Sequence, residues 1–451
     1  MLHICLAALL CMPPALLPDS VVAFEGVTVI PMDRERLLPN TTVIVRGDRV
    51  VSMAPATQAK VPAGALRVNG RGRFLLPGLA EMHAHIPGGQ EPDSIVERTL
   101  FLYVAGGVTT IRGMLGHPSH LELRARAARG EIISPTIYTS GPSFNGNSVP
   151  DPQSAVSMVV EQKNAGYDFL KIHPGITREV FDSLAATAER SGMRLAGHVP
   201  LDVGLQRALE ARYASIDHLD GYIEAIVKPQ APVKPTESEF FGLNLGEYLD
   251  ESRLPALIEA TRKADVWNVP TQTLMENLAP TVSANSLARR PEMRYIPVST
   301  IFKWAAAKGS ILESTGASRE SARRTIEARR KLIKALHDGG AGLLLGSDAP
   351  QIYNVPGFSI HRELELLVAA GLTPYQALQT GTRNVAQFFG TSDRTGTIEE
   401  GKRADLILLE SNPLADIRNT TQRAGVMLRG RWLSKAEIEK RLAAIAKAVG
   451  N

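Results

Sequence analysis

The chain of 451 residues carries a formal net charge of +4, and 44% of its residues are hydrophobic, 21% charged and 5% aromatic. This length is enough for one large domain and a smaller one, and the composition is that of a soluble globular enzyme. Acidic and basic residues are interleaved, which argues against an extended nucleic-acid-binding surface. The densest basic stretch, 319–336, has apolar residues at helical spacing and predicts an amphipathic helix with a solvated charged face. A nucleic-acid surface is the alternative, but no binding motif supports it.

The N-terminal segment resembles a secretory signal. Residues 4–17 are apolar, but they are too few to cross a bilayer as a straight helix and are interrupted by Pro13 and Pro14. The Val-Val-Ala sequence that ends at Ala23 fits a cleavage site, although no Lys or Arg precedes the apolar stretch. We therefore predict that residues 1–23 are a signal segment and that the protein is exported, either to the periplasm or to the medium. If the start codon is misassigned, the protein is instead cytoplasmic.

Both cysteines, Cys5 and Cys11, lie in this segment. A chain cleaved after Ala23 would therefore contain no cysteine. Disulfide bonds, thiol catalysis and cysteine-ligated zinc are then excluded.

Short strands separated by turns are predicted at both ends of the remaining chain. The first set runs from about Val21 to Leu76, where the Gly-Asp pair at 47–48 predicts a hairpin. A similar pattern returns at 396–410 and 424–433. Two β-rich ends around a different middle predict one small β-sandwich built from both termini. The expected boundaries are 24–76 and 391–435 for this composite sandwich and 436–451 for a C-terminal helix.

The middle of the chain, 77–390, alternates apolar runs with helical stretches. The first apolar run ends in His85, and amphipathic segments such as 177–192 and 201–212 separate most of the others. The other seven runs are 107–114, 135–142, 168–175, 193–200, 214–221, 266–274 and 341–350. Eight β/α units predict an α/β fold, a (β/α)8 TIM barrel with its helices outside. A doubly wound open sheet is the alternative, but no glycine-rich phosphate-binding loop follows the first run.

Two long insertions interrupt this alternation. Residues 222–252 are proline-rich and lack a steady period, which predicts a long loop after the sixth strand that serves as a lid or a substrate wall. Residues 276–318 form the second insertion, after the seventh strand.

Polar side chains with metal-binding chemistry stand at the ends of these runs, where barrel enzymes carry their catalytic groups. His83 and His85 are two positions apart, so a strand directs both to the same face. The fourth, fifth, sixth and eighth runs carry Lys171, His198, His218 and Asp348. A single histidine at a strand end is more often hydrogen-bonded than metal-bound. Six such residues in the same relative position predict a shared metal site.

The residue types suit a pair of divalent ions. Imidazole and carboxylate groups bind zinc and similar ions. Two ions about 3.5–4 Å apart need an anionic bridge, which a cationic lysine cannot provide. A desolvated, deprotonated Lys171 that has reacted with carbon dioxide would carry a carbamate, whose two oxygens can bridge the ions. The alternative for Lys171 is a buried lysine paired with an acid.

The order His-x-His, Lys, His, His, Asp resembles the amidohydrolase superfamily in its binuclear, carboxylated-lysine form. "LLPGLAEMHAH", "GVTTIRGM", "GSDAP", "GTIEEGKRADLILLE" and residues 361–390 are similar to its imidazolonepropionase-like branch, which includes metal-dependent dipeptidases. The resemblance extends from about residue 24 to 433. It implies a (β/α)8 barrel beside a small β-sandwich, which the alternation of runs also predicts.

The resemblance also implies a role for each ligand. His83, His85 and Asp348 would hold the more buried of two divalent ions, expected to be Zn²⁺, and His198 and His218 the more exposed one. The N6-carboxylated Lys171 and a hydroxide would bridge the two ions. Asp348 would accept the proton of this nucleophile and pass it to the leaving nitrogen, while the exposed ion polarises the carbonyl. The predicted catalytic residues are thus Asp348, Lys171 and His218.

Four further residues are candidate substrate contacts: His173, Tyr222, Asn145 and His361. His173 shares a strand face with Lys171. Dipeptidase-like members commonly carry a substrate-binding histidine after the third strand, but residues 140–152 contain none. Asn145 could replace that histidine as a hydrogen-bond donor, although an Asn-Gly turn explains it equally well. Packing or helix capping is the alternative for Tyr222 and His361.

The sequence therefore predicts a metal-dependent enzyme that hydrolyses an amide bond of a small molecule: a dipeptide, an N-acyl amino acid or a cyclic amide. The first alternative is the same centre acting on a lactone, carbamate or phosphotriester. The second is an exported, metal-loaded binding or scaffold protein without turnover. A mononuclear deaminase is disfavoured, because Leu201 occupies the position of the acid in the HxxE pattern that starts at His198. We expect a homo-oligomer that binds no nucleic acid and has no stable membrane span.

Overall fold

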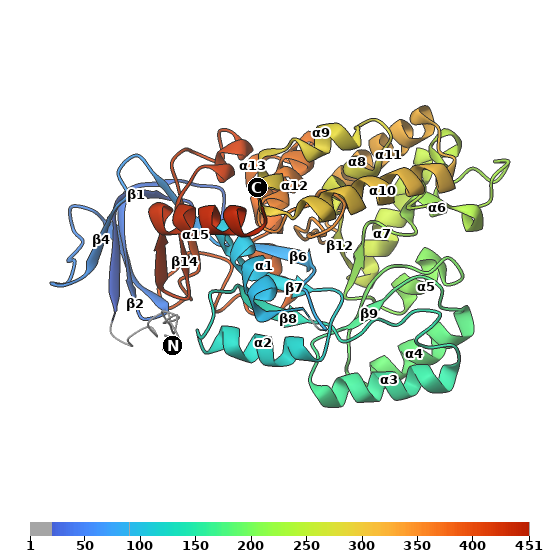
Figure 1. The fold of residues 1–451 in the computed structure, drawn as a ribbon, viewed down its shortest axis with the longest axis horizontal. Helices are drawn as coiled ribbons and strands as arrows, with labels where there is room; N and C mark the ends of the chain where they lie inside the picture. The colour runs from blue at the N-terminus through green and yellow to red at the C-terminus, as the bar shows by residue number, and fades with distance from the viewer. Residues whose placement is uncertain (1–19, 90, 451) are drawn as a thin grey trace, which may run out of the picture.

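The computed structural model describes residues 20–89 and 91–450. A large β-sheet lies at one end of the molecule, and shorter strands surrounded by helices make up the rest (Figure 1). The predicted signal segment falls mostly outside the described residues; its last three residues, 21–23, belong to the first strand. Within the described part of the chain, no helix is long and apolar enough to cross a membrane.

Both ends of the described chain contribute strands to one eight-stranded sheet. Its order is β15-β14-β13-β5-β1-β2-β3, and β4 pairs with β1. The strands are β1 (Val21–Val29), β2 (Leu38–Arg46), β3 (Arg49–Pro55), β4 (Leu66–Asn69), β5 (Phe74–Pro77), β13 (Leu406–Leu409), β14 (Arg423–Leu428) and β15 (Arg431–Ser434). The predicted hairpin at 47–48 joins β2 to β3, with Arg46 opposite Arg49. The antiparallel pair β5–β13, with Leu75 opposite Leu408, connects the two ends of the chain.

A single apolar cluster ties this sheet together. It includes Phe24, Leu75, Leu408 and Met427, which come from both ends of the chain. The ring of Phe24 meets Trp432 edge-on at a centroid distance of 5.1 Å, a favoured geometry for aromatic pairs. The C-terminal helix α15 (Lys435–Ala448) packs with β14, β15 and the first helix, α1 (Asp93–Ala105).

Parallel strands form two further sheets in the middle of the chain. One has the order β6-β7-β8 and the other β12-β11-β10-β9. Their bounds are β6 (Leu79–Ala84), β7 (Val108–Gly113), β8 (Thr136–Thr139), β9 (Leu170–Ile172), β10 (Leu195–Gly197), β11 (Ser215–Asp217) and β12 (Trp267–Val269). Each of the first seven predicted runs contains one of these strands. Isolated parallel bridges, Ser140–Phe169 and Phe144–Ile172, link the ends of β8 and β9.

The eighth predicted run, 341–350, departs from the expectation of a regular strand. It forms two isolated parallel bridges, Asn268–Leu343 to β12 and Ala84–Ala349 to the end of β6. Between them the Leu345 amide donates to the carbonyl of Thr380, in the following helical segment, and not to a neighbouring strand. The run therefore pairs on both sides without a continuous ladder.

Helices follow most of these strands and surround them (Figure 1). They are α2 (Ser119–Ala128), α3 (Pro152–Ala165), α4 (Arg178–Ser191), α5 (Gly204–Glu210), α6 (Tyr222–Ala225), α7 (Leu254–Ala264), α8 (Gln272–Leu278), α9 (Ala284–Ala288), α10 (Val298–Thr315), α11 (Arg319–Asp338), α12 (Ser359–Ala369), α13 (Pro374–Thr380) and α14 (Arg383–Phe388). Local signals set their ends: in α4, Thr177 caps the first turn through the Val180 amide, and Gly192 ends the helix in a left-handed conformation. The basic stretch 319–336 forms α11, as predicted.

Both insertions contain helices, whereas a long loop was predicted for the first. Residues 222–252 include α6 and three 3₁₀ helices, η1 (Pro235–Glu237), η2 (Gly246–Tyr248) and η3 (Glu251–Arg253). Residues 276–318 include α9, α10 and η4 (Pro291–Tyr295). The remaining 3₁₀ helix, η5 (Ile417–Thr421), precedes β14.

Candidate metal centre

The end of β6 carries the predicted histidine pair. His83 is buried, and the side chain of His85 keeps 21% of its surface exposed. Asp348 reaches the same point from the run 341–350, and its Oδ1 lies 2.7 Å from His85 Nε2. One potential ligand atom from each of the three residues lies within 4.8 Å of the others. The structure thus brings these three predicted ligands together in a group that could hold a metal ion.

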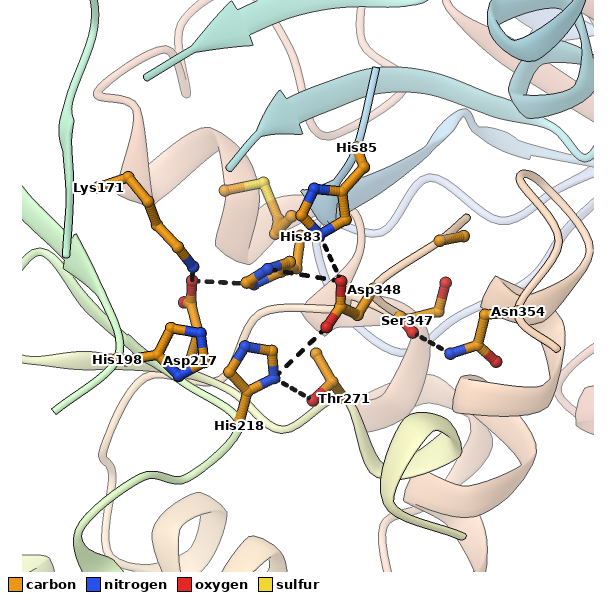
Figure 2. A network of polar contacts seen from close by, with 12 residues as sticks. His83, His85, Lys171, His198, Asp217, His218, Thr271, Ser347, Asp348 and Asn354 are labelled. Carbon is orange, nitrogen blue, oxygen red and sulfur yellow. Dashed lines mark hydrogen bonds and ion pairs between the residues drawn. The ribbon is translucent and has the colours of Figure 1, made fainter. Parts of the chain in front are cut away.

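Two more imidazoles continue this group across the neighbouring strand ends. His198 follows β10 directly, and His218 follows β11. The ring of His218 lies 4.5 Å from that of His83 and 4.6 Å from that of His198, measured between centroids. Figure 2 shows the four rings, with Asp348, around one region at the strand ends.

Hydrogen bonds fix the orientation of the two outer imidazoles. Thr271 Oγ1 donates to the carbonyl of Pro270 and so accepts from His218 Nδ1, at 2.8 Å (Figure 2). His198 Nδ1 lies 2.7 Å from the Asp220 carboxylate. In both rings the Nε2 atom is left available as a ligand, which is the arrangement that metal-binding histidines require.

Burial keeps these rings neutral. It lowers the pKa of His83 and His218 well below the usual value, and the pKa of His198 to about 3, with Lys171 adding to each effect. A neutral imidazole presents a lone pair, whereas a protonated one cannot bind a metal ion.

Lys171 lies in the middle of β9 and is completely buried. Its Nζ is 3.7 Å from Asp217 Oδ2, and Figure 2 shows the amine directed toward His83 and Asp217. Burial lowers the pKa of Lys171 below its usual value, while Asp217 and Asp348 act in the opposite direction. A buried amine of this kind gives up its proton more readily than a solvated one.

The buried polar atoms of the site fit a bound metal ion. Lys171 Nζ, His83 Nδ1 and Asp217 Oδ2 are buried and make no well-directed hydrogen bond within the described chain, although the last two are 2.9 Å apart. Buried polar atoms are normally hydrogen-bonded, so three unsatisfied ones at a single place need a further partner. Imidazole and carboxylate donors match zinc and similar divalent ions, and the residues therefore fit a metal centre.

Asp217 and Arg112 belong to this site, and sequence reasoning missed both. The guanidinium of Arg112, on β7, donates to Asp217 Oδ1 at 2.9 Å, to Ser215 Oγ at 2.7 Å and to the carbonyl of Met82 at 2.7 Å. Burial would raise the pKa of Asp217, but Arg112 and then Lys171 outweigh it and hold that pKa below the usual value. The available signal was the position of Asp217, directly before the predicted ligand His218.

Replacing Arg112 with leucine is expected to lower the free energy of unfolding by at least about 3 kcal/mol, because Asp217 would keep its buried charge without its main partner. Urea unfolding followed by circular dichroism measures this change. Arg323→Leu is the matched control, since Arg323 pairs with Glu320 on the exposed face of α11 and its loss should have no measurable effect. Equal urea midpoints for the two variants would contradict the role of Arg112.

A second buried acid, Glu81, supports the chain next to Asp348. Glu81 accepts hydrogen bonds from the amide and hydroxyl of Ser347, at 2.6 and 2.5 Å. Asn354 Nδ2 donates to the Ser347 carbonyl at 2.6 Å (Figure 2). Because Glu81 and His83 are on the same face of β6, these contacts fix Asp348 relative to the histidine pair.

The backbone at two strand ends is left-handed, which is unusual for residues with a side chain. His218 has φ 62° and Asp348 has φ 63°. Such conformations cost on the order of 1–3 kcal/mol each and persist where the surroundings enforce them. At His218 the enforcing group is Arg329 of α11, whose guanidinium donates to the carbonyls of His218 and Pro270 at 2.6 and 2.8 Å.

The four predicted substrate contacts lie in different surroundings. His173 is near the centre, with its ring 5.0 Å from that of His198. Tyr222 is buried and its hydroxyl bonds Thr261, whereas Asn145 Oδ1 accepts two amides within its own turn. Both ring nitrogens of His361 are engaged, by Thr420 and by the Gly106 carbonyl. The structure brings only His173 of these four to the metal-binding group, and the packing or turn contacts weighed as alternatives describe the other three.

A cavity of about 360 Å³ opens beside His198. Its lining residues come from the ends of β9, β10 and β11 and from the first insertion: His173, Pro174, His198, Val199, Leu201, Asp220, Gly221, Glu224, Ser238, Phe240 and Phe241. The predicted metal-binding group therefore has adjacent space for a substrate.

Comparisons with known proteins show the family of this chain. Residues 74–433 match the model of the amidohydrolase family. The chain is 23% identical to ochratoxinase from Aspergillus niger, over 86% of this chain and 81% of that protein, and 22% identical to imidazolonepropionase from Streptomyces griseus subsp. griseus, over 83% and 87%. Among solved structures, bottromycin amidohydrolase shares the fold with a TM-score of 0.72 at 22% identity, over 95% of this chain and 91% of that one.

Proposed function

The chain belongs to the amidohydrolase family, and on this premise we propose that it hydrolyses an amide bond of a small-molecule substrate at a pair of divalent metal ions. The family and the matched relatives make the protein a hydrolase of carbon–nitrogen bonds. The observation that carries the finer proposal is the convergence of four imidazoles, Asp348 and the buried Lys171 at one set of strand ends, where Lys171 Nζ, His83 Nδ1 and Asp217 Oδ2 make no well-directed hydrogen bond.

His83, His85 and Asp348 would hold one ion, and His198 and His218 the other, with zinc as the proposed metal. Lys171 would bridge them as a carbamate; its buried amine without a hydrogen-bond partner supports this assignment. When bound, such ions act as Lewis acids and lower the pKa of water, so that a nucleophile is available near neutral pH.

The chain's own residues then orient the reaction. The Asp348 carboxylate is held by its contact with His85 and by the Glu81–Ser347 network, and it would accept a proton at an oxygen and return it to the leaving nitrogen. Thr271 and Asp220 form hydrogen bonds with the Nδ1 atoms of His218 and His198, which leaves the Nε2 atom of each ring free to act as a ligand. The cavity beside His198 would hold a group next to the scissile bond.

We further propose the architecture that this chemistry needs, a closed (β/α)8 barrel at 77–390. The bridges from β8 to β9, from β12 to Leu343 and from Ala349 to β6 support closure, because together with the ladders of the two parallel sheets they join every consecutive pair of runs. The apolar cluster shared by both chain ends supports a separate β-sandwich of 24–76 and 391–435. Export and a homo-oligomer remain proposals from the sequence; cleavage after Ala23 would also remove the first three residues of β1.

Metal analysis with a substrate panel tests this function. The purified protein should contain zinc or a similar ion, lose hydrolysis of N-acyl amino acid amides and dipeptides on chelation, and regain it with Zn²⁺ or Mn²⁺ plus bicarbonate. Preferential hydrolysis of lactones, carbamates or phosphotriesters would overturn the amide assignment. Absence of turnover with every substrate in the metal-loaded protein would favour the binding or scaffold protein instead.

A further inference from the structure

The cavity beside His198 has an aromatic wall. The Phe241 ring lies 5.1 Å from His218 and 6.1 Å from His198, measured between centroids. Phe240 meets Phe241 edge-on at 5.3 Å with an interplanar angle of 87°. Phe240 remains 40% exposed at the cavity, so its apolar face is available to a ligand. One phenyl ring, that of Phe241, therefore lies directly beside two of the predicted metal ligands, and Phe240 extends this aromatic wall along the cavity.

Hydrogen bonds anchor the segment that carries these rings. Just after Phe241, Thr325 and Ser321 of α11 donate to the carbonyls of Gly242 and Leu243, each at 2.9 Å. Just before Phe240, the Ser238 hydroxyl donates to Glu224 at 2.6 Å. The aromatic wall is thus tied at both ends to helices, α11 on one side and α6 on the other.

The lining of the cavity offers an anionic occupant no guanidinium or ammonium group. Asp220 and Glu224 both line the cavity, and among the described residues that line it none is Lys or Arg. A substrate carboxylate placed here would leave water without a guanidinium or ammonium partner, which is costly. An uncharged ring instead gains apolar contact and an edge-on aromatic geometry.

The cavity also has room for groups larger than one ring. A second cavity of about 440 Å³ is lined by Val199, Leu201, Gly221 and Glu224, which line the first cavity as well. Arg253 also lines this second cavity, and its guanidinium donates to the carbonyl of Val227 at 2.9 Å. The aromatic wall, rather than a charge, is therefore the distinctive feature next to the metal-binding group.

We propose that this cavity binds an uncharged aromatic group of the substrate, packed against Phe240 and Phe241 beside the scissile amide. The substrate class is then an amide with an aromatic substituent and no free carboxylate on that side. This inference rests on the proposed amide hydrolysis and specifies which amides the site accepts.

Matched neutral amides test the inference with the full-length, metal-loaded protein. For cleavage of the N-acyl bond, monitored by release of acetate or phenylacetate, N-acetylphenylalaninamide against N-acetylalaninamide puts the ring on the amine side, and phenylacetylglycinamide against acetylglycinamide puts it on the acyl side. In at least one pair, kcat/KM of the aromatic member should be about tenfold higher or more. N-acetylphenylalanine, with its free carboxylate, should be hydrolysed more slowly than its amide if the ring enters from the amine side.

Variants assign the preference to the wall. Phe240→Ala and Phe241→Ala should each reduce the aromatic-to-aliphatic ratio of kcat/KM by about threefold or more, with metal content unchanged. Phe302→Ala is the matched control, because Phe302 lies on α10 with 72% of its surface exposed and does not line the cavity; its ratio should equal that of the parent protein.

The outcomes separate this inference from the function on which it rests. Hydrolysis of both pairs with equal kcat/KM, a preference for the free acid, or a ratio unaffected by both phenylalanine variants would overturn the aromatic site alone. Absence of hydrolysis of any amide would overturn the proposed function, and the aromatic site with it.

Discussion

Asp348→Asn is expected to lower kcat by about 10²- to 10⁴-fold, the range that a positioned general base contributes. Asparagine has the shape of aspartate but accepts no proton. Asp348 is buried, and its Oδ1 lies 2.7 Å from His85 Nε2, so an isosteric residue should preserve the packing of the turn. Steady-state kinetics at saturating metal would measure the loss of proton transfer separately from any loss of metal affinity.

Two further measurements make this prediction specific. Asp393→Asn changes an exposed carboxylate, 74% accessible, and should leave kcat unchanged. Circular dichroism and metal analysis of the Asp348 variant should match those of the parent protein. If kcat of the metal-saturated Asp348→Asn protein stays within tenfold of the parent value, another group must accept the proton.

The residues predicted as metal ligands could be found from sequence because strand ends impose a simple rule. Side chains at the carboxyl ends of neighbouring parallel strands meet, so His83, His85, His198, His218 and Asp348 did not need a three-dimensional search. The rule uses only the period of a strand and the order of the runs. The alternation of apolar runs with helical stretches also predicted seven of the strands in the middle of the chain, because these runs are short and clearly bounded.

The partners of these ligands could not be found in this way. Arg112 reaches Asp217 across 105 positions of sequence, and Glu81 reaches Ser347 across 266. A buried arginine and a surface arginine have the same sequence signature, and only packing decides between them. The same limit explains the eighth run, where the bond from the Leu345 amide to Thr380 replaced part of the expected ladder.

The insertions show a related limit. Residues 222–252 lack a period because their short helices are held by tertiary contacts, such as those of Thr325 and Ser321, rather than by an amphipathic pattern of their own. The aromatic wall of Phe240 and Phe241 lies in this part of the chain. The sequence thus predicted which strand-end side chains lie together better than which substrate group the neighbouring cavity accepts, since the shape of that cavity depends on these long-range contacts.

Lys171→Ala is expected to lower kcat/KM by on the order of 10³-fold, because it removes the proposed bridge between the two ions and with it several kcal/mol of metal-dependent stabilisation. The substitution also leaves space in a fully buried position of β9. Acetate or propionate can enter that space and supply two oxygens at the position proposed for the carbamate. Added short carboxylates should therefore restore part of the activity, in proportion to their concentration.

Rescue distinguishes a carbamate from a plain lysine, because the two differ in the sign of their charge. If Lys171 acts as an ammonium group paired with Asp217, at the 3.7 Å of the present structure, then methylamine or ethylamine should restore activity and carboxylates should not. Lys171→Met is the matched control: it fills the same volume without a charge, so neither kind of additive can enter and neither should rescue it. Rescue of Lys171→Ala by amines alone would rule out the carbamate bridge, whereas rescue by carboxylates alone requires an anion between the histidines.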